Sequence, residues 1–113
     1  EAVRNLRIVP RIALLSYSNF GSSKGYDAEK MSEAARYLHV HHPELIVDGE
    51  IQANFAMNQD KLAESFPFSA LHKRRVNTLI FPNLAAGNIS YKLLQEMAEI
   101  LHACAFLCLD HLH

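Results

Sequence analysis

The sequence is poor in the features that mark several large classes of protein. It has two cysteines and no tryptophan among 113 residues, and its formal net charge is only −1. Two cysteines cannot form the disulfide framework of a small secreted domain. A nearly neutral chain has no overall field that would attract nucleic acid or an acidic membrane surface. We therefore expect a cytoplasmic protein with reduced thiols and no nucleic-acid partner.

Long hydrophobic runs are also missing from the sequence. No stretch approaches the roughly 20 apolar residues that a membrane helix needs. Residues 1–5 lead into no long apolar core of the kind that a signal peptide contains. We expect neither a signal peptide nor a membrane partner. The hydrophobic fraction of 50% and the charged fraction of 20% are instead typical of one globular domain with a modest core.

A strand followed by a helix is predicted near the N-terminus. The run Ile12–Tyr17 has the composition of a buried strand, and Asp27 can cap a helix that begins near it. Spacings of three and four residues place one apolar face on this helix, formed by Met31, Ala34, Ala35 and Leu38. Pro43 predicts that the helix ends near residues 39–42.

Two further units of the same kind follow. A short strand, Leu45–Val47, precedes a helical stretch in which Asn58 is the candidate cap of Gln59–Ser65. The third strand, Val76–Phe81, leads through the polar segment 83–88 into a helix with an apolar side made of Leu93, Leu94, Met97 and Leu101. This alternation predicts an α/β fold, with a mostly parallel sheet and flanking helices.

Polar segments containing glycine follow all three predicted strands. Because the carboxyl ends of parallel strands meet at one edge of a sheet, these segments should gather there and bind a ligand. The candidate ligand-binding residues are Ser18, Asn19, Gly21, Ser22, Ser23, Asp48, Gly49, Asn83, Gly87 and Asn88. The loop Ser18–Ser23 precedes a helix, so its backbone N–H groups and hydroxyls are expected to hold an anion.

Several charged groups allow both a functional and a structural interpretation. Asp48 and Glu50 fit a carboxylate pair for acid–base chemistry or magnesium, and equally a structural turn. The basic run 72–75 fits a solvated connection or a phosphate contact, and should lie at the sheet edge opposite the polar loops. The histidines at 39, 41 and 42 fit a solvated helix end.

The C-terminal segment carries potential zinc ligands, which are His102, Cys104, Cys108, His111 and His113. Cysteines among apolar residues are more often small buried hydrophobic groups. We therefore expect no metal site in this chain and keep zinc as the alternative.

Three motifs in collinear order resemble the phosphate acetyl/butyryl transferase family. They are ALLSYSNFGSS (13–23), HPELIVDGEIQANFAMN (42–58) and LIFPNLAAGNISYKLLQ (79–95). The resemblance is greatest to the phosphotransacetylase-like C-terminal domain of bacterial NADP-dependent malic enzymes. Active transferases of the family tend to carry Ser-Thr-Gly or Ser-Thr-Lys-Gly where this chain has residues 18–21. They usually carry Asp-Gly-Pro where this chain has residues 48–50.

The resemblance implies part of an isocitrate/isopropylmalate-dehydrogenase-like fold. Residues 1–100 would form a partial phosphotransacetylase-like domain, and residues 101–113 a divergent tail. No catalytic residue can be assigned, because the Ser-Arg-Gly-like segment of active members has no counterpart in this sequence. Acetyl-CoA or phosphate is the implied ligand, and a homo-oligomer is the implied assembly. NADP and a divalent metal are expected only on a separate domain of the parent protein.

These features support three hypotheses about function. The first is a regulatory and assembly domain of an NADP-dependent malic enzyme, which decarboxylates malate to pyruvate, with this domain binding acetyl-CoA or phosphate without catalysis. The second is a phosphate acetyltransferase, which transfers acetyl from acetyl phosphate to CoA. The third is a purely structural fragment that mediates oligomerisation.

Overall fold

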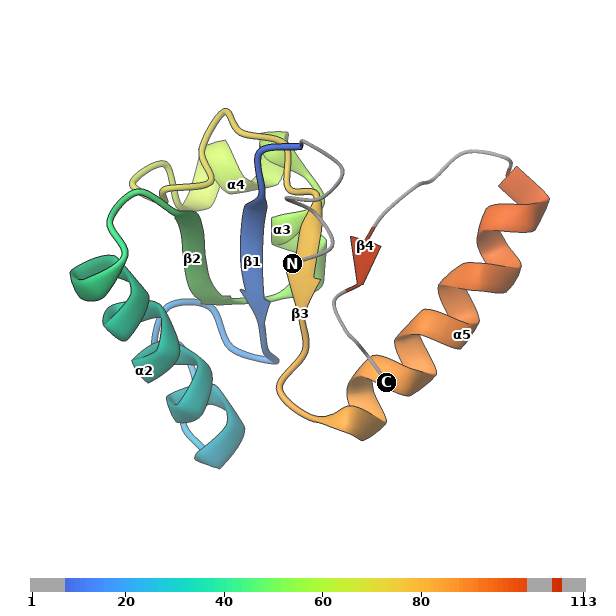
Figure 1. The fold of residues 1–113 in the computed structure, drawn as a ribbon, viewed down its shortest axis with the longest axis horizontal. Coiled ribbons are helices and arrows are strands. Elements are labelled where there is room, and N and C mark those ends of the chain that lie inside the picture. The colour runs from blue at the N-terminus through green and yellow to red at the C-terminus, as the bar shows by residue number, and fades with distance from the viewer. Residues whose placement is uncertain (1–7, 102–106, 109–113) are drawn as a thin grey trace.

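Four parallel strands form one sheet in the order β2–β1–β3–β4 (Figure 1). In the computed structural model, which describes residues 8–101 and 107–108, the strands are β1 (Arg11–Leu15), β2 (Ile46–Ile51), β3 (Thr78–Ile80) and β4 (Leu107–Cys108). The sequence thus predicted the α/β class and the parallel pairing correctly. The crossovers between parallel strands are made by helices, as this class of fold requires.

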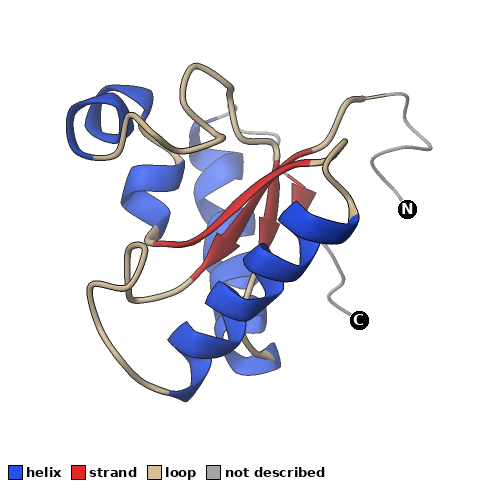
Figure 2. Ribbon diagram, turned by 90° about the vertical axis from the view of Figure 1, so that its left-hand side faces the viewer, coloured by secondary structure: helices blue, strands red, loops and turns tan. Residues whose placement is uncertain are grey.

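The helices are α2 (Tyr26–His41), α3 (Ala53–Ala56), α4 (Gln59–Ser65) and α5 (Leu84–Leu101). Figure 2 shows the sheet between its helices, with α2 in front of it. Asn58 caps α4 as predicted, because its side-chain oxygen accepts a hydrogen bond from the backbone N–H of Lys61. None of the helices in the described ranges is long and apolar enough to cross a membrane.

Successive residues of β1 point to opposite faces of the sheet and so enter two separate cores. Leu14 packs with α2 in a cluster whose buried members are Leu14, Met31, Ala35 and Val47, which confirms the predicted apolar face of that helix. Ala13 and Leu15 enter the other cluster, whose buried members are Ala13, Leu15, Ile51, Ala56, Leu62, Leu71, Val76 and Leu79. The sheet is therefore covered on both faces around β1 and β2.

Several boundaries differ from the sequence prediction. Strand β1 is Arg11–Leu15 where Ile12–Tyr17 was predicted, and β3 is Thr78–Ile80 where Val76–Phe81 was predicted.

Three further differences concern the helix ends and β2. The N-cap of α2 is Gly25, and Asp27 lies inside the first turn, where its charge still favours the helix dipole. Strand β2 continues to Ile51, so Asp48-Gly49-Glu50 is not a turn after the strand. Helix α5 begins at Leu84, which puts Gly87 and Asn88 inside a helix and not in a loop.

Strand β2 is longer than predicted because its pairing with β1 continues to Ile51, with one irregularity. Leu14 lies opposite Gly49, and Leu15 lies opposite Ile51, so Glu50 is an extra residue in β2. Gly49 permits this close pairing, since a Cβ atom at that position would lie 2.6 Å from the carbonyl oxygen of Leu14. The predicted turn was wrong. Its polar residues and glycine are typical of a turn, but here they belong to a paired strand with an irregularity.

Helix α5 differs from the other long helix in its surroundings. Leu84 and Ile89 are more than two-thirds exposed, and Leu93 and Met97 of the predicted apolar side are also exposed. The apolar side predicted from spacing is therefore present in sequence, but the described residues cover little of it.

Candidate functional site

The polar loop after β1 is closed by hydrogen bonds among its own residues. The backbone N–H of Ser18 donates to Ser16 Oγ at 3.2 Å, and that of Asn19 donates to Ser22 Oγ at 2.9 Å. The N–H of Ser22 returns to the carbonyl oxygen of Asn19 at 3.0 Å, and the N–H of Ser23 donates to Ser18 Oγ at 2.9 Å. These serine hydroxyls therefore satisfy the backbone of the loop.

Two further backbone N–H groups of the loop and one of its hydroxyls donate to Glu50. Its carbonyl oxygen accepts from the N–H of Phe20 at 2.8 Å. Its carboxylate oxygen Oε2 accepts from the Ser18 hydroxyl at 2.7 Å and from the N–H of Gly21 at 3.0 Å. Glu50 is 2% exposed, and its second oxygen, Oε1, is buried and has no hydrogen-bond partner among the residues that the structure describes. An acid of β2 thus lies inside the loop that was predicted to hold an external anion.

Two neighbouring contacts fix the position of this loop. The ring of Phe20, a residue with the unusual φ of 48°, lies 5.1 Å from the ring of Phe66 and 5.2 Å from that of Phe68. Asn19 Oδ1 accepts a hydrogen bond from the backbone N–H of Gln52 at 2.7 Å. The loop is therefore anchored by aromatic packing on one side and by the end of β2 on the other.

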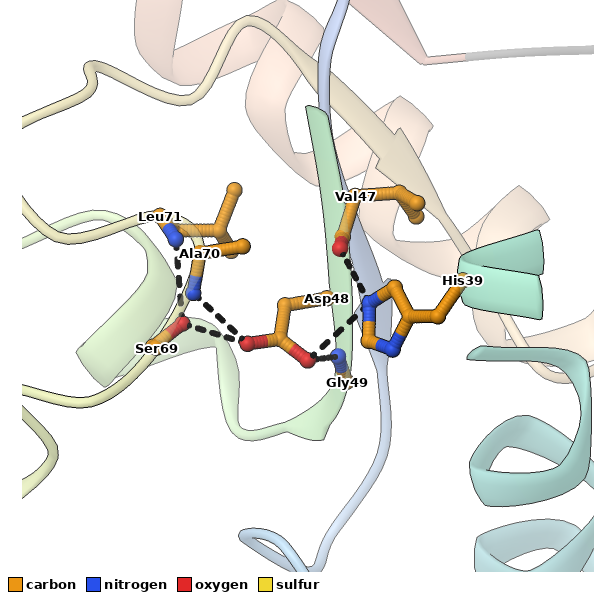
Figure 3. A network of polar contacts seen from close by, with 7 residues as sticks. All are labelled: His39, Val47, Asp48, Gly49, Ser69, Ala70 and Leu71. Atoms are coloured by element: carbon orange, nitrogen blue, oxygen red, sulfur yellow. Dashed lines mark hydrogen bonds and ion pairs between the residues drawn. The ribbon is translucent and has the colours of Figure 1, made fainter. Parts of the chain in front are cut away.

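Asp48 belongs to a different network, which joins β2 to the segment after α4 (Figure 3). Its Oδ2 accepts from the Ser69 hydroxyl at 2.8 Å and from the N–H of Ala70 at 2.9 Å, while Oδ1 accepts from the N–H of Gly49 at 2.9 Å. Asp48 and Ser69 are both buried. The carboxylate therefore fastens a segment distant in sequence onto the strand.

His39 of α2 approaches the same carboxylate from the other side (Figure 3). Its Nε2 lies 2.7 Å from the carbonyl oxygen of Val47 and 3.7 Å from Asp48 Oδ1. A nitrogen this close to a carbonyl must carry hydrogen, so Nε2 is the donor. The aspartate lies between the histidine and Ser69, so this is not the hydrolase triad, in which histidine contacts serine. His39 is thus more than part of a solvated helix end.

Asp48 and Glu50 bind different segments and share no hydrogen-bond partner among the described residues, which favours a structural role over a carboxylate pair. Within the described ranges, no group of three or more histidine, cysteine, aspartate or glutamate residues could hold a metal ion. The potential zinc ligands His102, Cys104, His111 and His113 lie outside those ranges, and the side chain of Cys108 is not described. The zinc alternative stays a prediction.

The candidate residues after β3 are distributed differently from the prediction. Asn83 accepts the N–H of Ala86 at 2.8 Å through its Oδ1, and its amide donates to Asp27 Oδ2 at 3.1 Å. It therefore connects the start of α5 to the first turn of α2. Gly87 is buried and Asn88 is exposed, both within α5. That these residues bind a ligand stays a prediction.

The basic run lies at the opposite end of the sheet, as predicted. Arg11, the first residue of β1, donates through Nε to the carbonyl oxygen of Arg75. Lys73, Arg74 and Arg75 are exposed, so they face solvent away from the loop at the carboxyl end of β1. The same segment also contains the buried Ser69 and Leu71 and is more firmly attached than a solvated connection would be.

Sequence reasoning did not assign Glu50, Phe20 and Ser69 their roles. Glu50 stands directly before Ile51 and shortly after the apolar residues 45–47, which was a weak signal that it is buried and needs donors. Phe20 in an otherwise polar loop was a weaker signal of anchoring. Nothing local marked Ser69, since its partner is 21 residues away in sequence.

The comparisons with known proteins agree with this architecture. The chain matches the family model described as phosphate acetyl/butaryl transferase over residues 1–108. That match runs into the segment 101–113 that was set apart as a divergent tail, and the division stays a prediction. The NADP-dependent malic enzyme of Haemophilus influenzae is 43% identical over 95 residues, which is 84% of this chain and 12% of that protein. The phosphate acetyltransferase of Clostridium acetobutylicum is 37% identical over 100 residues, 88% of this chain and 30% of that protein.

Solved structures show the same relationship. A phosphotransacetylase from Streptococcus pyogenes superposes with a TM-score of 0.78 at 36% identity, covering 86% of this chain and 29% of that one. The EutD phosphotransacetylase from Staphylococcus aureus gives a TM-score of 0.78 at 31% identity, covering 87% and 31%. The chain thus spans less than a third of the length of these relatives. The chain belongs to the phosphate acetyl/butaryl transferase family.

Proposed function

We propose that this chain is part of a phosphotransacetylase-like domain that regulates and assembles an NADP-dependent malic enzyme, binding acetyl-CoA or phosphate without transferring acetyl groups. The observation that carries the proposal is the Glu50 carboxylate in the loop after β1, where it accepts from Ser18 and Gly21. The similarity to the malic enzyme of Haemophilus influenzae supports the choice of parent.

Acetyl transfer from acetyl phosphate needs a thiol and a carbonyl in near-attack geometry, with positive charge around the phosphate. The donors of this loop are neutral hydroxyl and backbone groups, and a negative side chain lies among them. The nearest arginines in sequence to β3, Arg74 and Arg75, face solvent at the other end of the sheet. Loss of one preorganised charge stabiliser lowers a rate by about 10²–10³. This arrangement favours a binding role over a catalytic one.

The proposal also covers the features of the parent that the sequence suggested. The complete domain would have an isocitrate/isopropylmalate-dehydrogenase-like fold and form a homo-oligomer in the cytoplasm. NADP and a divalent metal would be bound by the separate domain that oxidises malate.

Calorimetry with acetyl-CoA on the full-length parent tests the proposal. We expect binding, together with a change in the rate of malate oxidation. No binding and no change in rate would remove the regulatory role. Turnover of acetyl phosphate and CoA by the purified chain would contradict a non-catalytic domain.

The second candidate function is phosphate acetyltransferase activity of a longer parent. It is favoured by the structural similarity to two phosphotransacetylases. A CoA-acylation assay on the full-length parent separates the two candidates, because only this one gives turnover. Phosphate acetyltransferase activity also requires the parent to supply positively charged groups around the bound phosphate.

A further inference from the structure

We propose that Glu50 is a built-in anion that occupies the loop Ser18–Ser23 and excludes phosphoryl groups from it. This inference rests on the proposed function, in which the sheet edge binds acetyl-CoA or phosphate. It specifies which part of such a ligand can enter the loop. A ligand that reaches this loop must present an uncharged group there, and any phosphate it carries must lie elsewhere.

The first step of the argument is that the loop has no backbone donor to spare. The N–H groups of residues 18, 19, 20, 21, 22 and 23 all donate to protein atoms, which belong to Ser16, Ser18, Asn19, Ser22 and Glu50. An external anion bound through backbone N–H groups would have to displace one of these acceptors.

The second step is the geometry at Oε2 of Glu50. A hydroxyl at 2.7 Å and an N–H at 3.0 Å converge on this single oxygen. Two converging donors of this kind are what a loop offers to an oxygen of a bound phosphate. The carboxylate oxygen therefore takes the place that a phosphoryl oxygen would take.

The third step is charge. A phosphoryl group close to the donors of Ser18 and Gly21 would also be close to the carboxylate. Two like charges about 4 Å apart, at the effective dielectric of a protein surface, weaken binding by about a thousandfold. Exclusion is therefore both steric and electrostatic.

The fourth step is that stability alone does not account for a glutamate here. Its Oε1 is buried and has no partner within residues 8–101, and a buried oxygen that lacks a hydrogen bond destabilises a fold. A purely structural tie would use both oxygens, as Asp48 does with Gly49, Ser69 and Ala70. The position of Glu50 is instead the one expected of a residue that determines which ligands enter the loop.

The test compares the chain with its Glu50→Ala variant in two-dimensional NMR titrations with inorganic phosphate and with formate. In the unsubstituted chain the amide resonances of residues 18–23 should not move with phosphate. In Glu50→Ala the freed donors should bind both anions, so the Gly21 amide should shift saturably. The affinity for phosphate should rise by about a hundredfold to a thousandfold. Formate should also raise the melting temperature of Glu50→Ala, because it replaces the missing carboxylate.

Glu33→Ala is the matched control, since it removes an exposed glutamate of α2 and should respond to neither anion at Gly21. Saturable movement of the Gly21 amide with phosphate in the unsubstituted chain would overturn the proposal. So would a folded Glu50→Ala that responds no more than the unsubstituted chain. If Glu50→Ala does not fold, Glu50→Gln takes its place. Its amide oxygen still occupies the loop, but it is neutral and accepts hydrogen bonds more weakly than a carboxylate, so phosphate can displace it without charge repulsion. Phosphate at high concentration should then shift the Gly21 amide in Glu50→Gln and not in the unsubstituted chain, and the absence of a shift in Glu50→Gln would overturn the proposal.

These outcomes are separable from those of the proposed function. Failure of acetyl-CoA to bind the full-length parent removes the regulatory role and leaves the residue-specific titration unaffected. A phosphate-induced shift of the Gly21 amide in the unsubstituted chain would contradict the exclusion of phosphate by Glu50. It would not decide whether the parent binds acetyl-CoA.

Discussion

Two carboxylates of strand β2 hold two different segments of the chain, and they do so unequally. Asp48 fastens the segment around Ser69 and has hydrogen-bond partners on both oxygens. The side chain of Glu50 holds the loop Ser18–Ser23 through Oε2, while Oε1 is buried and has no partner in the described part of the chain. A fully paired buried carboxylate is a structural connection, whereas a half-paired one lowers stability and needs another explanation. From this comparison we infer that Asp48 stabilises the fold, whereas Glu50 determines which ligand groups can enter the loop.

The largest effect on stability is expected from a substitution of Gly49, which lies between the two acids in β2. A Cβ atom there would lie 2.6 Å from the carbonyl oxygen and 2.7 Å from the Cβ of Leu14, and neither can move without breaking the β1–β2 pairing. Gly49→Ala should lower the free energy of unfolding by about 3 kcal/mol or more. Urea unfolding followed by circular dichroism measures it.

Gly25→Ala is the matched control for that substitution. Its added Cβ would meet the hydroxyl of Tyr17, the end of an exposed side chain that can move aside. It should therefore be milder than Gly49→Ala. An equal or smaller loss at Gly49 would show that the two strands are not held as closely as the structure indicates.

The next largest effect is expected from loss of the fully paired acid. Asp48→Ala removes the acceptor of Ser69, Ala70 and Gly49 and leaves buried donors without partners. The free energy of unfolding should fall by about 2–4 kcal/mol. Glu64→Ala, which removes an exposed acid of α4, should change it by less than about 0.5 kcal/mol. A loss at Asp48 as small as this control would contradict its structural role.

How much of this arrangement the sequence could predict depends on how local each feature is. The apolar face of α2, the cap at Asn58 and the end of α2 before Pro43 follow from neighbouring residues, and the structure confirms them. The length of β2 could not be predicted from its own residues, because pairing with β1 determines where the strand ends. The two carboxylate networks join residues 21 and 32 positions apart, so only the folded chain shows which acid holds which segment.

The start of α5 could not be predicted for a different reason, because its local sequence is ambiguous. Residues 83–88 contain two asparagines and a glycine, which favour a loop, yet the helix begins at Leu84 with Asn83 accepting the N–H of Ala86. Asparagine is common both in loops and before helices, so composition alone could not distinguish the two.

A smaller effect is expected in the loop that Glu50 holds. Gly21 has a φ of +90°, which side chains with a Cβ rarely adopt, although no atom lies within 4 Å of where that Cβ would be. Gly21→Val should therefore lower the free energy of unfolding by about 1–3 kcal/mol through backbone strain. Gly21→Asn should be milder, because asparagine tolerates a positive φ better than valine. An unchanged melting temperature for Gly21→Val would show that this strain is absent.

The smallest effect is expected at His39, on the far side of the Asp48 network. His39→Ala removes one hydrogen bond to the Val47 carbonyl oxygen from a side chain that is 45% exposed. The free energy of unfolding should fall by about 0.5–1.5 kcal/mol. His42→Ala, at the exposed end of α2, is the control and should have a smaller effect. Equal effects of the two would indicate that His39 is only part of a solvated helix end.

The most direct measurement of the central claim is a double-mutant cycle between Ser18 and Glu50. The structure places the Ser18 hydroxyl 2.7 Å from Glu50 Oε2 in a buried setting. The free energies of unfolding of Ser18→Ala, Glu50→Ala and the double variant, each compared with the unsubstituted chain, give the coupling between the two side chains. If Glu50 fills the loop, the coupling should be about 1.5–3 kcal/mol, the range for a hydrogen bond to a charged group. A coupling near zero would contradict the account, because it would mean that the carboxylate is not held by the loop.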